Sequence, residues 1–158
     1  MEKHVLSVLV QNNPGVLARI SSLFGRRNFN IYSITAAITN DPMITRITMV
    51  VDGDEETLQQ IIKQTQKLEE TIEVYPLSQA KSLHRDLLLV KIGVGEDQRC
   101  KVIEICQVYE AKIVDLSVSS MIIELTGTPD KIDRFLLMIQ HYTMMEMCRT
   151  GVTALERG

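Results

Sequence analysis

The stretch that decides the fold is VQNNPGVLARISSLF, residues 10–24, because it joins two different hydrophobic periodicities. Residues 4–11 form a short apolar run that a turn then stops, which predicts a buried strand. After the turn, apolar residues recur at the spacing of one helix face, namely Val16, Leu17, Ile20, Leu23 and Phe24. Between the two patterns stand four residues typical of turns: Asn12, Asn13, Pro14 and Gly15.

The helix with this apolar face is expected to end near Asn28. Asparagine tolerates the left-handed backbone angles of a helix C-terminus, and Arg26 and Arg27 suit the negative end of the helix dipole. A phosphate-binding role for the two arginines is the alternative interpretation.

Four further elements complete a first unit. They are strands over 30–39, 44–52 and 71–77 and a helix whose apolar face runs from Leu58 to Leu68. The order strand, helix, strand, strand, helix, strand is that of the ferredoxin-like unit. This unit is an antiparallel four-stranded sheet with both helices on one face.

The same order of elements returns in the second half of the chain. Its elements are strands over 87–94, 112–118, 120–127 and 144–148, a helix marked by Val102 and Tyr109, and a helix opened by Thr128 and Pro129. The fold class is therefore α+β, with two ferredoxin-like βαββαβ domains in tandem. We expect domains over 1–77 and 87–158, joined by a linker over 78–86, where small and charged residues interrupt the pattern.

Composition excludes several classes of partner. The 158 residues carry a formal net charge of -3 and no long basic run, so nucleic acid is not expected as a partner. The apolar run near the N-terminus is too short to span a membrane and has no cleavage-site pattern. The expected location is therefore cytoplasmic, with no membrane association.

No catalytic constellation stands out in the sequence. The three cysteines Cys100, Cys106 and Cys148 have no metal-ligand spacing and are expected to be buried reduced thiols, with no metal site. The G-x-G at residues 93–95 lacks the third glycine of a dinucleotide fingerprint. The acidic run Asp54–Glu56 suits the first turn of a helix without any catalytic role.

The turn after the first strand has two interpretations. In the architectural one, Asn13 caps the helix and Pro14 is its first residue, and neither contacts a ligand. In the functional one, free amides at the helix N-terminus attract a carboxylate, and Gly15 lets the ligand approach the backbone closely. A small zwitterion such as an amino acid would also find neutral polar groups and apolar walls there, from Asn12, Asn30, Val16, Leu17 and Ile31.

Several segments resemble a known family. They are NNPGVLARISSLFGRRNFNIYSITAA, ITRITMVVDGDEETLQQIIKQTQKL, LLLVKI, KIVDLSV, ELTGTPDKIDRFL and the closing CRTGVTALERG. These segments resemble the small, regulatory subunits of acetolactate synthase, also called acetohydroxyacid synthase, whose first domain is an ACT domain. The chain departs from the family at Asn28, where glycine is usual, and at MMEMCRTG, residues 144–151.

The resemblance implies a chain that is not itself catalytic and binds no cofactor. Family members bind a large catalytic subunit that uses thiamine diphosphate, magnesium and FAD, raise its activity, and confer feedback inhibition by valine or a related branched-chain amino acid. A free-standing ACT-domain amino-acid sensor that regulates another enzyme is the closest alternative.

The resemblance also implies where the effector binds. In the family it lies between paired ACT domains, where the first strand-to-helix loop of one meets the second strand of the other. By position this assigns Asn12, Gly15 and Asn30, followed by Asn13, Val16 and Ile31. We expect at least a homodimer, because a four-stranded unit of this kind leaves edge strands whose amides are unpaired.

Two other protein classes share the order of elements. An RNA-recognition motif stacks bases on aromatic residues of its inner strands, and residues 44–52 contain none. An acylphosphatase presents backbone amides and an arginine to phosphate, which Gly15 and Arg19 echo. Pro14, however, removes an amide where that site needs one.

Overall fold

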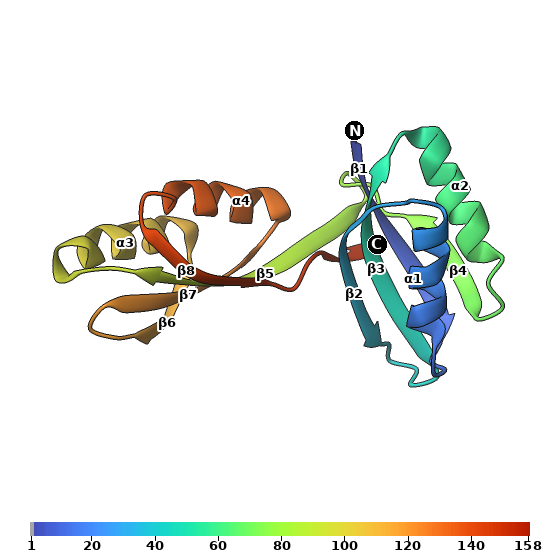
Figure 1. Ribbon diagram of the computed structural model, residues 1–158, viewed down its shortest axis with the longest axis horizontal. Coiled ribbons are helices and arrows are strands. Elements are labelled where there is room, and N and C mark those ends of the chain that lie inside the picture. The colour runs from blue at the N-terminus through green and yellow to red at the C-terminus, as the bar shows by residue number, and fades with distance from the viewer. Residues whose placement is uncertain (1) are drawn as a thin grey trace. The chain divides into compact units, whose positions relative to one another are not determined.

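The computed structural model describes residues 2–158, which divide into two compact units (Figure 1). Unit 1 contains the chain up to Leu83 and, in addition, residues 152–158. Unit 2 contains residues 84–151. The α+β architecture with two ferredoxin-like units is confirmed, but the end of the chain belongs to the first unit and not to the second.

Unit 1 is built on a four-stranded antiparallel sheet in the order β2-β3-β1-β4. Its elements are β1 (Glu2–Gln11), α1 (Val16–Arg26), β2 (Ile31–Ile38), β3 (Ile44–Gly53), α2 (Glu55–Gln66) and β4 (Thr71–Pro76). Alternate residues of the inner strands are buried against both helices, including Leu6, Val8, Ile47 and Met49. The buried strand residues, at every second position, and the buried helix residues, at every third or fourth position, therefore form one core on one face of the sheet, as the sequence patterns predict.

The C-terminus of α1 closes in the way predicted from Asn28. This residue has φ 56°, and its N–H donates to Gly25 O at 3.2 Å. The N–H of Phe29 donates to Phe24 O at 3.0 Å, and the two phenyl rings meet edge to face with centroids 5.9 Å apart. This is a Schellman motif with its usual apolar contact, so asparagine takes the place in which glycine is usual.

The opposite face of the same sheet is covered in part by the end of the chain. Strand β9 (Thr153–Glu156) pairs with β5 (Ser82–Gly93), and Val152 and Ala154 pack against Val50 and Leu77. Thr35 Oγ1 donates to Val152 O at 3.0 Å. The expected boundaries differ from this arrangement in two respects. Residues 82–86, expected to be part of the linker, belong to strand β5. Residues 152–158, expected in the second domain, belong to unit 1.

Unit 2 repeats the fold in the order β6-β7-β5-β8. Besides β5 it contains α3 (Glu96–Tyr109), β6 (Lys112–Leu116), β7 (Ser120–Gly127), α4 (Pro129–Met138) and β8 (Thr143–Arg149). Thr128 caps α4 by accepting the Lys131 N–H at 3.2 Å, and Pro129 is the first helical residue, as predicted. Its core is separate from the core of unit 1.

Replacing Asn28 tests the Schellman motif. We expect Asn28→Ala to lower the free energy of unfolding of unit 1 by about 1 kcal/mol, because alanine has no polar side chain to stabilise positive φ. Asn28→Gly, the matched control, should be at least as stable as the parent chain. Urea denaturation of both variants measures this, and equal loss of stability in both would contradict it.

Candidate functional site

The loop between β1 and α1 turns on a glycine. Gly15 is the N-cap of α1 with φ 82° and ψ -2°, and the helix begins at Val16. The architectural prediction that Asn13 caps the helix and that Pro14 is its first residue is therefore wrong. The Asn13 side chain donates to Gln11 Oε1 at 3.1 Å instead, and the left-handed glycine makes the bend that the prediction gave to proline.

The N-terminus of α1 is left without a side-chain cap. Gly15 has no side chain to offer, and the first turn contains no acidic residue. Within residues 2–158, the N–H groups of Leu17 and Ala18 donate to no acceptor, whereas the Arg19 N–H reaches Gly15 O at 3.0 Å. Two amide donors therefore point out of the positive end of the helix dipole.

The helix that occupies the equivalent place later in unit 1 is different. The Asp54 carboxylate accepts the Thr57 N–H at 2.8 Å, and chiefly this backbone hydrogen bond lowers the pKa of Asp54 below its usual value. Glu55 and Glu56 follow in the first turn of α2. Since α2 is supplied with anions and α1 is not, only α1 leaves its amides for an anion from outside.

Asn12 anchors the loop to the β2–β3 connection. Its side-chain amide donates to Pro42 O at 2.9 Å, and its Oδ1 accepts from Thr45 Oγ1 at 3.2 Å. Its backbone N–H donates to Met43 O at 2.8 Å. Both polar atoms of the Asn12 side chain make hydrogen bonds within the chain, so the main contribution of Asn12 is to hold the β1–α1 loop in position.

Asn30 and Ile31 lie at the other end of the same sheet. The β1–β3 register pairs Gln11 with Ile44 beside the loop and Glu2 with Gly53 at the far end. Ile31 pairs with Val51, close to that far end. Ten strand residues span about 30 Å, so a single chain does not bring the loop and Asn30 together.

The edge strand β2 connects the two ends and is not paired on its outer side within the described chain. Its side chains include exposed apolar residues, and α1 adds Leu17, which is 48% exposed. The exposed apolar residues of β2 are Tyr32, Ile34 and Ile38. Isolated edges of this kind favour continuation of the sheet by another chain.

Other groups singled out in the sequence are distributed differently from expectation. Cys106 is buried, and its burial raises the pKa of the thiol, but Cys100 and Cys148 are exposed. The expectation of three buried thiols is therefore wrong for two of them. Arg27 donates to Gln64 Oε1 at 3.0 Å across the helix pair.

Residues 2–158 contain neither a metal-ligand cluster nor a membrane-spanning helix. No group of three or more His, Cys, Asp and Glu side chains is placed to hold a metal ion. None of the helices in this part of the chain has the length and apolar character needed to cross a membrane.

Comparison with known protein families gives two adjacent matches. A family described as the AHAS small subunit-like ACT domain matches residues 6–73. A family described as the small subunit of acetolactate synthase matches residues 85–158. The first match covers the β1–α1 loop and β2, and the second begins inside β5.

Individual relatives extend over nearly the whole chain. A probable acetolactate synthase small subunit of Archaeoglobus fulgidus is 42% identical over 156 residues, which are 99% of this chain and 98% of the relative. The acetolactate synthase small subunit of Mycolicibacterium smegmatis is 41% identical over 155 residues, which are 98% of this chain and 91% of the relative.

A solved structure agrees in fold. The crystal structure of the acetolactate synthase small subunit of Thermotoga maritima superimposes with a TM-score of 0.91 at 34% identity. The superposition covers 100% of this chain and 99% of the other.

The strain at Gly15 can be measured directly. We expect Gly15→Ala to lower the free energy of unfolding of unit 1 by about 1 kcal/mol, because an L side chain is disfavoured at positive φ. The added Cβ meets only Arg19 Nη1, at 3.6 Å, so crowding adds little. Gly25→Ala is the control, because Gly25 lies in α1 and an added Cβ would meet no atom within 4 Å. Alanine is the better helix former, so this variant should have a higher free energy of unfolding. Urea denaturation showing no difference between the two variants would contradict the assigned backbone angle.

Proposed function

The chain belongs to the family of acetolactate synthase small subunits, and from that premise we propose that it regulates a catalytic large subunit. In this proposal it raises the activity of the large subunit and makes it sensitive to valine or a related branched-chain amino acid. Thiamine diphosphate, magnesium and FAD belong to the large subunit, and this chain performs no chemistry itself.

The observation that carries the proposal is the uncapped N-terminus of α1. The effector carboxylate would accept hydrogen bonds from the backbone N–H groups of Leu17 and Ala18, which have no acceptor within residues 2–158. The absence of a Cβ at Gly15 leaves room for that approach. Val16 begins the helix directly beside these donors, and Asn13 flanks them on the loop.

The rest of the site would come from a second copy of the chain. Two β2 edge strands that pair antiparallel about a twofold axis bring the Ile38 end of one beside the Ile31 end of the other. The Ile38 end is the end at which the loop lies, because Gln11 pairs with Ile44 there. Asn30 and Ile31 of the second copy would thus complete the site around the loop of the first, and a dimer would hold two equivalent sites.

The principal test is Gly15→Asp, which should abolish feedback inhibition while activation of the large subunit is kept. An aspartate carboxylate would face the effector carboxylate at the same two amides. Like charges about 4 Å apart repel by about 4 kcal/mol at an effective dielectric constant of 20, which weakens binding on the order of several hundred-fold. Arg19, already paired with Glu70, reduces this repulsion, so the figure is an upper bound. Acetolactate production by the reconstituted holoenzyme across a valine series measures the effect.

Gly95→Asp is the control for adding an aspartate at a helix N-cap, and Gly15→Asn is the control for a side chain of the same size at φ 82° without the charge, which should weaken inhibition less. Gly95 is also a helix N-cap, but its φ is -81° and nothing lies within 4 Å of an added Cβ. Valine sensitivity should be unchanged in this variant. Asn12→Ala should weaken inhibition less than Gly15→Asp, because it loosens the loop without adding a charge. Full valine sensitivity in the Gly15 variant would return the loop to a purely architectural role.

A second proposal divides the labour between the units: unit 2 contributes to activation of the large subunit. The Thr150 N–H donates to Leu87 O at 3.0 Å, so the strands that enter and leave unit 2 run side by side. Residues 88–149 can therefore be replaced by a short Gly-Ser linker, which removes most of unit 2 and keeps residues 82–87 of β5 for pairing with β9.

We expect this shortened chain to bind valine but to fail to activate the large subunit. Calorimetric titration measures the first property, and acetolactate production measures the second. Full activation by the shortened chain would contradict the division of labour. Capture of a thiamine-dependent large subunit by the intact chain separates this proposal from that of a free-standing amino-acid sensor, which would capture none.

A further inference from the structure

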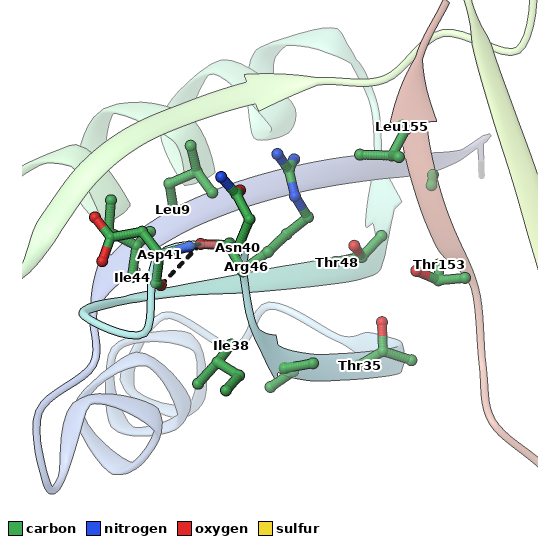
Figure 2. Close-up of a pocket in the computed structure, with 14 residues that line it drawn as sticks. Leu9, Thr35, Ile38, Asn40, Asp41, Ile44, Arg46, Thr48, Thr153 and Leu155 are labelled. Atoms are coloured by element: carbon green, nitrogen blue, oxygen red, sulfur yellow. Dashed lines mark hydrogen bonds between the residues drawn. The ribbon is translucent and has the colours of Figure 1, made fainter.

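A pocket of about 610 Å³ lies on the face of the unit 1 sheet that carries no helix (Figure 2). Strands β2 and β3 and their connection supply one side, and β9 supplies the other. Every lining residue belongs to unit 1, so the pocket is complete within one chain. It is distinct from the proposed effector site, which requires two copies.

One basic side chain stands in this pocket. Arg46 lies on β3 opposite Leu9 of β1, on the face away from the helices. Its Nη1 donates to Ser7 Oγ at 2.6 Å and to Tyr75 OH at 2.8 Å. The hydroxyl groups hold the guanidinium in one orientation but leave its positive charge uncompensated.

The Nε and Nη2 side of the Arg46 guanidinium has no partner in the part of the chain that the structure describes. Within residues 2–158, Nε and Nη2 of Arg46 donate to no acceptor, and no carboxylate lies within ion-pair distance of it. Asp41 also lines the pocket, but its carboxylate accepts the Met43 N–H at 2.9 Å. Figure 2 shows that carboxylate directed away from Arg46.

This arrangement is unusual for an arginine and matches one kind of ligand. A half-buried cation is normally paired, because burial without a counter-charge costs free energy. The Nε and Nη2 donors form the side of the guanidinium that binds the two oxygens of a carboxylate in parallel. The hydrogen bonds to Ser7 and Tyr75 fix the Arg46 guanidinium before any ligand binds, which reduces the conformational entropy lost on binding.

The walls set the size and character of the rest of the ligand. The pocket volume lies within the range of small-molecule sites, roughly 300–1,000 Å³. Leu9, Ile44 and Leu155 provide apolar surface, and Thr48, which is buried, also lines the pocket. We propose that this pocket binds a small aliphatic carboxylate, with its oxygens on Nε and Nη2 of Arg46 and its chain against the apolar walls.

Two sources of such a ligand share this chemistry, an amino acid and the corresponding 2-oxo acid. Isobutyrate contains the common part of both and lacks the ammonium group that the proposed effector site is suited to bind. It is therefore the first probe, followed by 2-oxoisovalerate and valine. The readout is the Arg46 Nε–Hε resonance in the nitrogen-15 spectrum of the full chain, assigned by its loss in Arg46→Lys.

Isobutyrate should shift the Arg46 Nε–Hε resonance in a saturable manner, whereas the neutral isobutyramide should not. In Arg46→Met, binding is followed through the backbone amide resonances of Ala37 and Thr48, which line the pocket, and it should be weakened at least about tenfold, the value of a charged hydrogen bond. Arg134→Met is the matched control and should bind normally, because Arg134 is exposed in unit 2 and paired with Asp130.

A second variant keeps the test decisive if Arg46→Met does not fold. Ala37 lies opposite Arg46 in the β2–β3 register and is exposed. Ala37→Glu would supply Arg46 with a carboxylate of the chain itself and should abolish isobutyrate binding. A titration with no saturable shift, equal shifts from isobutyramide, or undiminished binding in Ala37→Glu would overturn the proposal.

Gly15→Asp separates this inference from the proposed effector site. Isobutyrate should bind this variant as it binds the parent chain, because Gly15 is not among the residues that line the pocket. If Gly15→Asp abolished isobutyrate binding, the probe would be occupying the β1–α1 loop and the pocket proposal would fail. Loss of valine inhibition in Gly15→Asp with isobutyrate binding retained would support both sites independently.

Discussion

The pairing of β1 with β3 is the constraint on which the rest of unit 1 depends. The register runs without a slip from Glu2 and Gly53 to Gln11 and Ile44. Since side chains alternate across a strand, this one register puts Val8 and Ile47 under the helices and Leu9 and Arg46 on the other face. A shift of this register by one residue would move core side chains to the pocket face and pocket side chains to the core face. The β1–β3 hydrogen bonds therefore specify both faces of the sheet.

The same register separates the two halves of the predicted effector site. The β1–α1 loop and Asn30 come from opposite ends of the sheet, about 30 Å apart by strand geometry. A ligand that contacts both must therefore contact two chains. The exposed apolar edge of β2 is a surface that could provide this second contact, because an unpaired edge already carries the donors and acceptors for another strand. Binding of an effector and association of two copies would then be thermodynamically linked.

The two helix N-termini of unit 1 differ in how their first-turn amides are satisfied. Asp54 satisfies the first turn of α2, and the chain adds two further acids there. The first turn of α1 has neither, and a left-handed glycine occupies the position where a capping side chain would stand. An unsatisfied N-terminus destabilises a helix by about 1 kcal/mol relative to a capped one, and the Schellman motif at Asn28 and Phe29 secures the other end of α1.

The sequence by itself determined the elements from β1 to β8, their order and most of their faces, because hydrophobic periodicity and turn residues act over a few neighbouring positions. The helix from Val16 to Phe24, Asn28, and Thr128 with Pro129 were interpreted correctly on that basis, except that Leu17, expected on the buried face of the helix, is 48% exposed. It could not show that Gly15 rather than Asn13 caps α1, since a positive φ has no signature beyond the glycine itself. Only the tertiary structure decided that β9 returns to unit 1, that Arg46 lacks a carboxylate partner among residues 2–158, and that Asn30 lies far from the loop. Each of these depends on contacts between residues distant in the chain, and the four-residue β9 is too short for its alternation to indicate which sheet face it covers.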